Sequence, residues 1–351
     1  MTIALPIHGR GTADNPPNRF ESISVDDDYD HVAPEERVSP ETSFFHDETR
    51  TIIARNDSPD IPFDFSLNPY RGCEHGCIYC FARPSHEYLS LSAGLDFETK
   101  IFVKREAPRL LRRELMLNSW KPSSITLSGV TDCYQPAERL FRLTRGCLEV
   151  LLEFRNPASI ITKSALVTRD IDILSKMAGH GLVEVYISVT TLDNKLASTL
   201  EPRAAAPQRR LDTIARLSDA GISVGVMVAP IIPGLTDHET ASILKAAANA
   251  GAKRAGFVPL RLPFGVKTLF ETWIQTHYPD RAGKVLNRVR DLRGGRLNDP
   301  NFGTRMRGQG AFADHMKALF ALSCKKYGLN EARYAQPASA FRRPGGQLDL
   351  F

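Results

Sequence analysis

Asn68-Pro-Tyr-Arg-Gly-Cys73-Glu-His-Gly-Cys77-Ile-Tyr-Cys80-Phe-Ala-Arg-Pro84 is the stretch from which the fold and the chemistry of this chain can be predicted. It holds half of the six cysteines, at C-x3-C-x2-C spacing, directly after a run at 61–67 that reads as a strand. Glycines between the cysteines let the backbone turn sharply. Three thiolates on one tight loop suit a soft metal centre. An iron–sulfur cube takes four, so one iron would stay open to bind a small molecule.

Three other interpretations of the cysteine motif compete with a cluster. A disulfide framework does not suit a chain of this size without a secretion signal, because its compartment is expected to be reducing. Three buried core thiols do not suit the polar residues between them, among them Glu74 and His75. A zinc site with His75 or His86 as fourth ligand stays open, although structural zinc usually takes its ligands as two spaced pairs. The cluster is therefore favoured, with zinc second.

The motif Cys73-x3-Cys77-x2-Cys80, with Tyr79 just before the last cysteine, resembles the signature of the radical S-adenosylmethionine (SAM) superfamily. The wider sequence resembles the spore photoproduct lyase-like branch, whose members are often labelled DNA repair photolyases, over about 61–310. The resemblance implies a [4Fe-4S] cluster on these cysteines, with SAM chelated by the open iron. It also implies cleavage of SAM to a 5′-deoxyadenosyl radical that abstracts a hydrogen atom, and a reductant such as flavodoxin or ferredoxin.

Length and composition predict a soluble protein of the cytoplasm. The 351 residues suit one large barrel domain with appendages, or two small domains. No apolar run has the length of a membrane span. The first residues lack the apolar stretch and the cleavage site of a signal peptide. A thiolate-bound cluster would survive in this compartment.

Charge is unevenly distributed along the chain. Residues 1–60 hold 5 Lys or Arg against 13 Asp or Glu, whereas residues 251–351 hold 18 against 7. A solvated basic face would also give this pattern. The basic final third is nevertheless consistent with a polyanionic partner.

Short apolar runs alternate with amphipathic helical stretches from residue 61 onward, which predicts a parallel α/β fold. The expected strands are 61–67, 124–129, 159–163, 183–189, 222–228 and 254–260, and helices are expected at 106–117, 137–154, 170–178, 207–220 and 236–250. Six such units match the partial (β/α)6 barrel of the TIM type that the resemblance implies. We divide the chain into an acidic, extended or disordered leader (1–55), a core barrel (56–265), a basic helical extension (266–330) and a flexible tail (331–351).

Working residues in such barrels gather where strands end, and the resemblance implies SAM contacts there. The implied set is Tyr79, Ser128, Gly129, Asp132, Lys163, Ser188, Glu201, Arg203, Ala229 and Leu260. Ordinary roles compete for each part of the set. They are an N-cap loop around Asp132, a solvated Lys163, an internal Glu201–Arg203 salt bridge, and plain core packing for the last two.

Two further surfaces are predicted beyond the barrel. Residues 281–307 hold eight basic and two acidic residues, and Arg293, Arg296, Arg305 and Arg307 on glycine-rich loops suit phosphate contacts of a nucleic acid. Aromatic residues are sparse there, so base stacking has little support. The C-terminal Gln347-Leu348-Asp-Leu350-Phe351 is similar to the pentapeptide by which bacterial repair proteins bind the DNA sliding clamp. A strap onto the protein's own surface is the alternative.

One residue departs from the lyase pattern. Spore photoproduct lyase carries a hydrogen-donating cysteine in the loop after the second strand, where this chain has Gly129, and only Cys133 nearby could substitute. Thymine-dimer repair is therefore in doubt, whereas SAM cleavage is not. The first hypothesis is a radical SAM enzyme acting on nucleic acid. The alternatives are a radical SAM enzyme acting on a protein or metabolite, and a non-catalytic, metal-stabilised adaptor of the sliding clamp.

Overall fold

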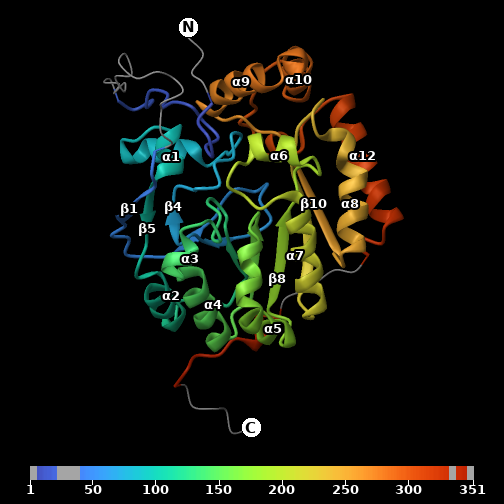
Figure 1. Cartoon of the computed structure of the whole chain (residues 1–351). Coiled ribbons are helices and arrows are strands. Elements are labelled where there is room, and N and C mark those ends of the chain that lie inside the picture. Colours follow the sequence, from blue (N-terminus) through green and yellow to red (C-terminus); the bar gives the residue numbers. More distant parts are fainter. Residues whose placement is uncertain (1–5, 22–39, 332–336, 346–351) are drawn as a thin grey trace.

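The computed structural model describes residues 6–21, 40–331 and 337–345. Its main sheet has seven strands in the order β10-β9-β8-β7-β6-β3-β2 (Figure 1). Neighbours from β3 to β10 pair in parallel, and β2 pairs antiparallel with β3 at the edge. The strands are β2 (Ile53–Arg55), β3 (Phe65–Leu67), β6 (Ile125–Leu127), β7 (Ala158–Thr162), β8 (Val183–Ser188), β9 (Ser223–Ile231) and β10 (Arg254–Pro259). The first and last parallel strands do not pair, so the six form an open, partial barrel, as predicted.

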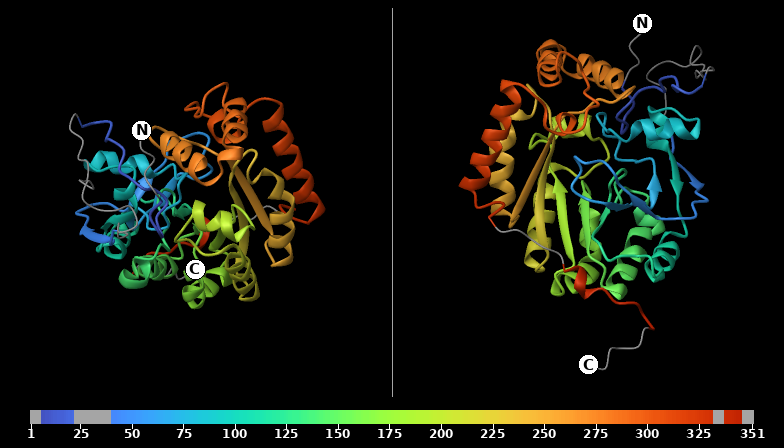
Figure 2. Two further views of the ribbon diagram at one scale, coloured as in Figure 1. Left: turned by 45° about the horizontal axis from the view of Figure 1, so that its top comes forward. Right: turned by 180° about the vertical axis from the view of Figure 1, so that it is seen from behind.

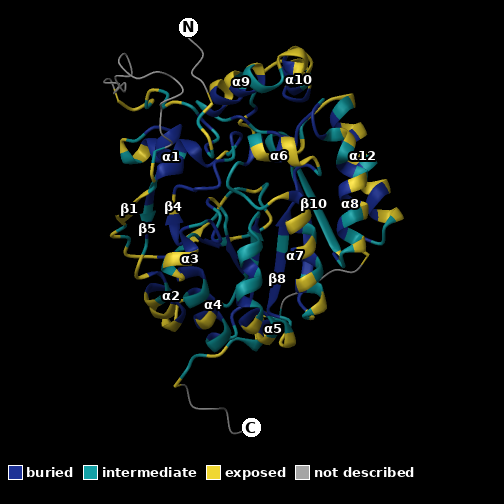
Figure 3. Cartoon of the chain, viewed as in Figure 1, coloured by how far each residue is buried: buried dark blue, intermediate teal, exposed yellow. Residues whose placement is uncertain are grey.

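Helices cover the outer face of this sheet (Figures 1 and 2). They are α2 (Ala107–Met116), α4 (Leu143–Phe154), α5 (Ile171–Gly179), α7 (Pro207–Asp219) and α8 (Thr240–Asn249). Each buries residues at three- and four-residue spacing, as Ile243, Leu244 and Ala247 of α8 do. The main core lies between these faces and the apolar strands, and the outward faces are exposed (Figure 3).

Two boundaries differ from the sequence prediction for identifiable reasons. The first strand begins at Phe65 and not at 61. Pro62, within the expected range, has no N–H to donate to a strand ladder. The expected helix 137–154 is broken at Arg142, whose φ is +52°, into α3 (Glu138–Phe141) and α4. The carboxylate of Glu138 accepts hydrogen bonds from the backbone N–H of Thr144 (3.0 Å) and Arg145 (3.3 Å) at the start of α4.

The leader is more ordered than expected over the part that is described. Ser43–His46 forms β1, which pairs in parallel with β5 (Lys100–Val103), and β5 also pairs with β4 (Tyr70–Arg71). Residues 6–20, which we call the N-terminal strap, run against α1 (Leu95–Thr99). The strap buries Arg10 and Thr12. The described part of the leader is therefore extended but packed into the protein, and not disordered.

The C-terminal third packs onto the barrel in two places. Helices α9 (Val266–His277) and α10 (Pro279–Leu292) lie over the end of the sheet where the parallel strands finish, beside α6 (Asn194–Leu200), and share a second core with Ile78 (Figure 1). The short α11 (Thr304–Arg307) leads to α12 (Ala311–Lys326), which lies beside α8. Among the described residues, no helix has the length and apolarity to cross a membrane.

Part of the expected tail is held in place. The backbone N–H of Arg342 donates to Phe154 O at 2.9 Å, and the ring of Phe341 lies 6.1 Å from that of Phe154. The prediction of a flexible tail is therefore wrong for 337–345. Gln347, Leu348, Leu350 and Phe351, predicted to bind a clamp, lie outside the described residues.

We expect Gly11→Ala to detach the N-terminal strap. A Cβ at Gly11 would lie 1.7 Å from the carbonyl oxygen of Gly76 in the cysteine loop, so one of the two backbones must move. The expected results are a lower melting temperature and faster proteolysis within the strap. Gly283→Ala in α10 is the control, because a Cβ there meets nothing within 4 Å and Ala favours helix by about 1 kcal/mol. Equal behaviour of both variants would contradict the proposed packing.

Candidate active site

The cysteine loop follows β3 and β4 and is held by backbone and side-chain hydrogen bonds. Gly72 and Gly76 have φ of +79° and +67°, which are conformations that favour glycine. Gln135 clamps the loop from the β6 side, since its Oε1 accepts from Glu74 N and its Nε2 donates to Gly72 O, both at 3.0 Å. Arg83 Nε donates to Cys77 O at 2.9 Å. The loop is thus shaped by the protein itself.

The three thiols of this loop fit a cluster better than a zinc ion. All three are free, and burial raises the pKa of each. Asp132 and then the charges of Cys77 and Cys80 further raise the pKa of Cys73, which places the three thiols within electrostatic reach of one another. The donor set suits a cube with one open iron.

The histidines proposed as fourth zinc ligands are engaged elsewhere. His75 Nδ1 lies 3.3 Å from Oδ2 of Asp132. His86 is fully buried, and its Nε2 lies 2.9 Å from Lys100 O. Each contact engages one ring nitrogen, and Nδ1 of His86 is buried without a hydrogen-bond partner. The preference for a cluster over zinc therefore rests on the three thiols and not on these contacts.

Glu201 is the centre of a buried polar cluster beside Cys77. It accepts hydrogen bonds from Tyr79 and Arg210, and from Thr190 Oγ1 at 2.7 Å, and Lys163 Nζ lies 4.0 Å away. Burial alone would raise the pKa of Glu201, but Arg210 and Lys163 outweigh it and lower this pKa to about 2. After burial, Glu201 is also the main cause that raises the pKa of Cys77. Tyr79, Lys163 and Glu201 of the predicted SAM set therefore lie together next to a candidate cluster ligand.

The arginine that pairs with Glu201 differs from the expected one. Arg210 is fully buried and also donates to Ser188 O at 3.1 Å, so Ser188 contributes its carbonyl to this cluster. Arg203 instead lies 3.2 Å from Glu74 Oε1 and donates to Thr42 Oγ1 at 3.2 Å. An internal Glu201–Arg203 bridge is thus not formed. Arg210 could have been found from the sequence, because it falls on the apolar face of α7 with Thr213, Ile214 and Leu217.

Asp132 joins the loop after β6 to the end of β7. Its carboxylate accepts from Thr162 Oγ1 at 2.7 Å and from Lys163 N at 2.8 Å. Burial would raise its pKa, but His75 and these hydrogen bonds lower it to about 2. Asp132 therefore orients His75 and the backbone of Lys163, a larger role than the N-cap that was its alternative.

The preceding residues of the loop after β6 are closely packed. Ser128 has a φ of +72°, and its Oγ accepts from Cys133 N at 2.8 Å. A Cβ at Gly129 would lie 2.9 Å from Cβ of Ser66 on the neighbouring strand. This close approach requires glycine at position 129. The position therefore cannot carry the hydrogen-donating cysteine that spore photoproduct lyase has in this loop.

Three predicted site residues have mainly structural surroundings. Cys133 is fully buried in the main core, so it does not present a thiol at the barrel mouth, and the predicted hydrogen-donor role is not supported. Leu260 is fully buried in the second core, and plain packing accounts for it. Ala229 is partly exposed, and its carbonyl accepts from Thr190 Oγ1 at 3.2 Å.

Two arginines expected to bind nucleic acid are occupied within the protein. Arg293 is buried, and its guanidinium donates to the carbonyls of Pro259, Leu260, Thr304 and Arg305 at 2.5–3.1 Å. Arg305 forms two hydrogen bonds with Asp60, at 2.6 and 2.7 Å. The prediction is wrong for Arg293, which cannot reach a phosphate from this position. Arg296 and Arg307 are exposed.

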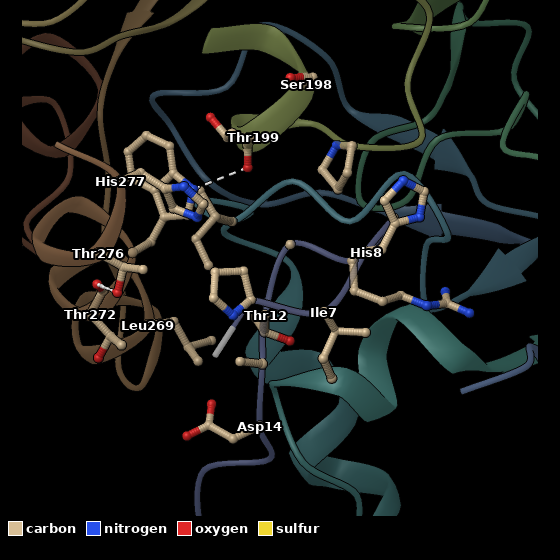
Figure 4. A pocket seen from close by; sticks show the side chains of 18 residues that line it. Ile7, His8, Thr12, Asp14, Ser198, Thr199, Leu269, Thr272, Thr276 and His277 are labelled. Carbon is tan, nitrogen blue, oxygen red and sulfur yellow. Dashed lines mark hydrogen bonds between the residues drawn. The ribbon is translucent and has the colours of Figure 1, made fainter. Parts of the chain in front are cut away.

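Two pockets adjoin the cysteine loop. The first, of about 350 Å³, lies between the N-terminal strap and α9, and Ile78 lines it (Figure 4). In Figure 4, Ile7 and Thr12 of the strap lie across from Leu269 and Thr276 of α9. The second, of about 440 Å³, is lined by His75 and by the loops after β7 and β8. We call it the arginine pocket, because Arg139, Arg169, Arg203, Arg209 and Arg216 line it.

The cysteine loop and the open parallel sheet define the class of protein. The radical SAM superfamily matches the chain over residues 67–247. The chain belongs to this superfamily and is a radical SAM enzyme, which implies a [4Fe-4S] cluster and SAM.

Individual relatives agree with this assignment. An uncharacterized protein of Mycobacterium tuberculosis is 36% identical over 234 residues, which cover 66% of this chain and 68% of that protein. The radical SAM Nα-GlyT isomerase of Pseudomonas phage M6 is 22% identical over 176 residues, or 49% of this chain and 34% of the isomerase. Spore photoproduct lyase with bound AdoMet and dinucleoside spore photoproduct matches in fold, with a TM-score of 0.59 at 15% identity over 82% of this chain and 80% of the lyase.

Arg210→Met should strongly destabilise the protein, because it removes the cation closest to the buried carboxylate of Glu201. Removing one partner of a buried ion pair typically costs about 3–5 kcal/mol. Urea unfolding should show a loss of this size. Adding Glu201→Gln should recover part of it. Arg209→Met, one residue earlier and exposed, should change the free energy of unfolding by less than about 0.5 kcal/mol. Similar losses for Arg209→Met and Arg210→Met would contradict this account.

Asp132 should make stability depend on acidic pH. Its folded-state pKa of about 2 lies below the ordinary 3.8, so its contribution is complete above pH 4 and is lost as pH falls toward 2. The difference corresponds to about 2 kcal/mol. The advantage of wild type over Asp132→Asn in urea unfolding should therefore shrink between pH 4 and 2. Asp219→Asn, at an exposed position, is the control. An advantage that grows in acid would overturn this assignment.

Proposed function

We propose that this radical SAM enzyme acts on a nucleic acid, and the arginine pocket is the observation that carries the proposal. Five guanidiniums and the imidazole of His75 line the pocket, and no carboxylate of a described residue does. His75 lies between Cys73 and Cys77 in the cysteine loop. A cationic hollow beside the candidate cluster would hold the phosphates of a substrate near the reacting centre.

Three of the five arginines are available to a ligand. Arg139, Arg209 and Arg216 are exposed, and among the described residues no side chain is paired with their guanidiniums. The other two are already in ion pairs, Arg169 with Glu138 and Asp170, and Arg203 with Glu74. The paired arginines would shape the pocket, while the free ones would meet phosphate oxygens, for which the guanidinium fork is well suited.

The rest of the site supports the same enzyme class. Cys73, Cys77 and Cys80 would hold the cluster, and Lys163 and Glu201 would meet the charged methionine end of SAM. Bound together, cluster and SAM supply a 5′-deoxyadenosyl radical that abstracts hydrogen. Tyr79 and Arg210 keep the carboxylate of Glu201 ionised and fixed in place.

One structural relative supports a nucleic-acid substrate over a protein or metabolite. Solved structures of spore photoproduct lyase hold a dinucleoside spore photoproduct. This likeness is one of fold, so the arginine pocket of this chain carries the argument. Arg296 and Arg307, both exposed, stay proposed as secondary phosphate contacts.

We expect the reconstituted enzyme to form 5′-deoxyadenosine from SAM under reducing, anaerobic conditions, and Cys77→Ala to form none. A labelled single-stranded oligonucleotide should bind with strong salt dependence. Arg209→Gln with Arg216→Gln should lower the salt slope by about 1.4, because each phosphate that is no longer neutralised lowers it by about 0.7. Anisotropy titrations at several salt concentrations measure this slope.

The matched control is Lys245→Gln with Lys317→Gln, which removes the same charge from exposed positions of α8 and α12. Its slope should stay at the wild-type value. SAM cleavage without oligonucleotide binding would favour a protein or metabolite substrate. Absence of SAM cleavage in the wild type would instead favour the adaptor.

A further inference from the structure

Four exposed aromatic side chains lie on the strap, on the segment after the cysteine loop and on the segment after β10, and we call them the aromatic rim: Phe20, Phe81, Tyr88 and Phe264. Their exposed fractions are 56%, 49%, 72% and 57%. Phe81 directly follows the ligand Cys80, and Phe264 lies in the loop between the end of β10 and α9. Exposed aromatics of this size, gathered beside a reacting centre, indicate a binding surface.

Arg19 stacks on three of these rings, and Arg261 stacks on the fourth. The guanidinium carbon of Arg19 lies 3.8 Å from the ring centre of Phe264, 4.5 Å from that of Phe20 and 5.4 Å from that of Tyr88. The rings of Phe20 and Tyr88 lie 5.0 Å apart. Arg261 lies 5.7 Å from the ring centre of Phe81. The rim is therefore both flat-faced and cationic, although Glu87 neutralises part of the charge of Arg19 at 2.8 Å.

The rim lies where the barrel is open. The strands β10 and β3 end without pairing to each other, and the rim takes Phe264 from the segment after β10 and Phe81 from the segment after β3. Arg305 of α11 reaches Asp60, just before β3, so the two sides are also tied by an ion pair. A strand of substrate lying on the rim would therefore reach the cysteine loop through the gap in the barrel.

Phe264 is held in a conformation that is unfavourable for phenylalanine. Its φ is +48°, in the left-handed region that bulky residues rarely adopt. Such strain costs on the order of 1–3 kcal/mol and gathers at functional sites. A glycine or asparagine would adopt this turn more easily. The presence of phenylalanine therefore indicates that its exposed ring has a function.

We propose that the aromatic rim stacks unpaired bases of a nucleic-acid strand, single-stranded or extruded from a duplex, and so presents a nucleotide to the cysteine loop. The inference rests on the proposed function and adds the substrate class: a nucleotide taken out of the base stack. Every base offers a flat π-face to aromatic rings and guanidinium planes, which is how proteins hold unpaired strands. Chemistry on a base requires that it leave the stack.

The test compares two labelled strands of equal length and charge, an oligothymidylate and its base-free deoxyribose-phosphate counterpart. The reconstituted holoenzyme should bind the base-bearing strand more tightly in anisotropy titrations. Phe264→Asn should weaken binding of that strand by about 5- to 150-fold, the equivalent of removing one stacked base. Its binding of the base-free strand should not change.

Controls separate stacking from folding. Phe264→Asn should melt no lower than wild type, because asparagine tolerates a positive φ, and Phe264→Trp should keep the preference for bases. Leu322→Asn, at a similarly exposed position on α12, should bind both strands as wild type does. Equal affinity of the wild type for both strands, or an unchanged preference in Phe264→Asn, would overturn the rim. Binding of neither strand would instead overturn the nucleic-acid function on which it rests.

Discussion

The buried ion pair between Arg83 and Glu98 is the interaction on which the geometry of the cysteine loop depends. Both side chains are fully buried, and Arg83 Nη2 lies 2.5 Å from Glu98 Oε1. Arg83 also donates to the carbonyl of Cys77, whereas Glu98 accepts from the backbone N–H of Gly11 at 2.9 Å and Thr12 at 3.2 Å. One pair thus joins the loop, α1 and the N-terminal strap. Since a buried charge without its partner is costly, the three segments hold a common position.

The site is built from a series of buried polar pairs and not from apolar packing alone. Glu201 with Arg210, Asp132 with His75, and Glu98 with Arg83 each join two elements of the site. Apolar residues of similar volume would often stabilise a fold as well or better. Hydrogen-bonded polar pairs instead fix the orientation of each side chain, because hydrogen-bond geometry determines where each carboxylate lies. This suits a site that must place the polar methionine end of SAM beside a cluster.

Local patterns in the sequence were enough to predict the scaffold. The six parallel strands were expected within a few residues, because apolar runs and helical spacing are properties of neighbouring residues. The cysteine spacing likewise placed Cys73, Cys77 and Cys80 on one loop together with Tyr79, and the end of an expected strand pointed to Lys163. Partner choice could not be predicted, because it depends on three-dimensional proximity. Arg210 and not Arg203 pairs with Glu201, and Arg293 turns inward to four backbone carbonyls.

The same limit explains why the surfaces proposed for substrate differ from those suggested by composition. A count of charges pointed to residues 281–307, yet the arginine pocket draws its five arginines from three stretches between 139 and 216 where the local balance is ordinary. The aromatic rim comes from three separate segments, so no single window along the chain shows all of it. An open barrel makes both surfaces possible. The main sheet stays open between its end strands β10 and β2, and the strap, together with the segments after the cysteine loop and after β10, supplies the side chains of the rim.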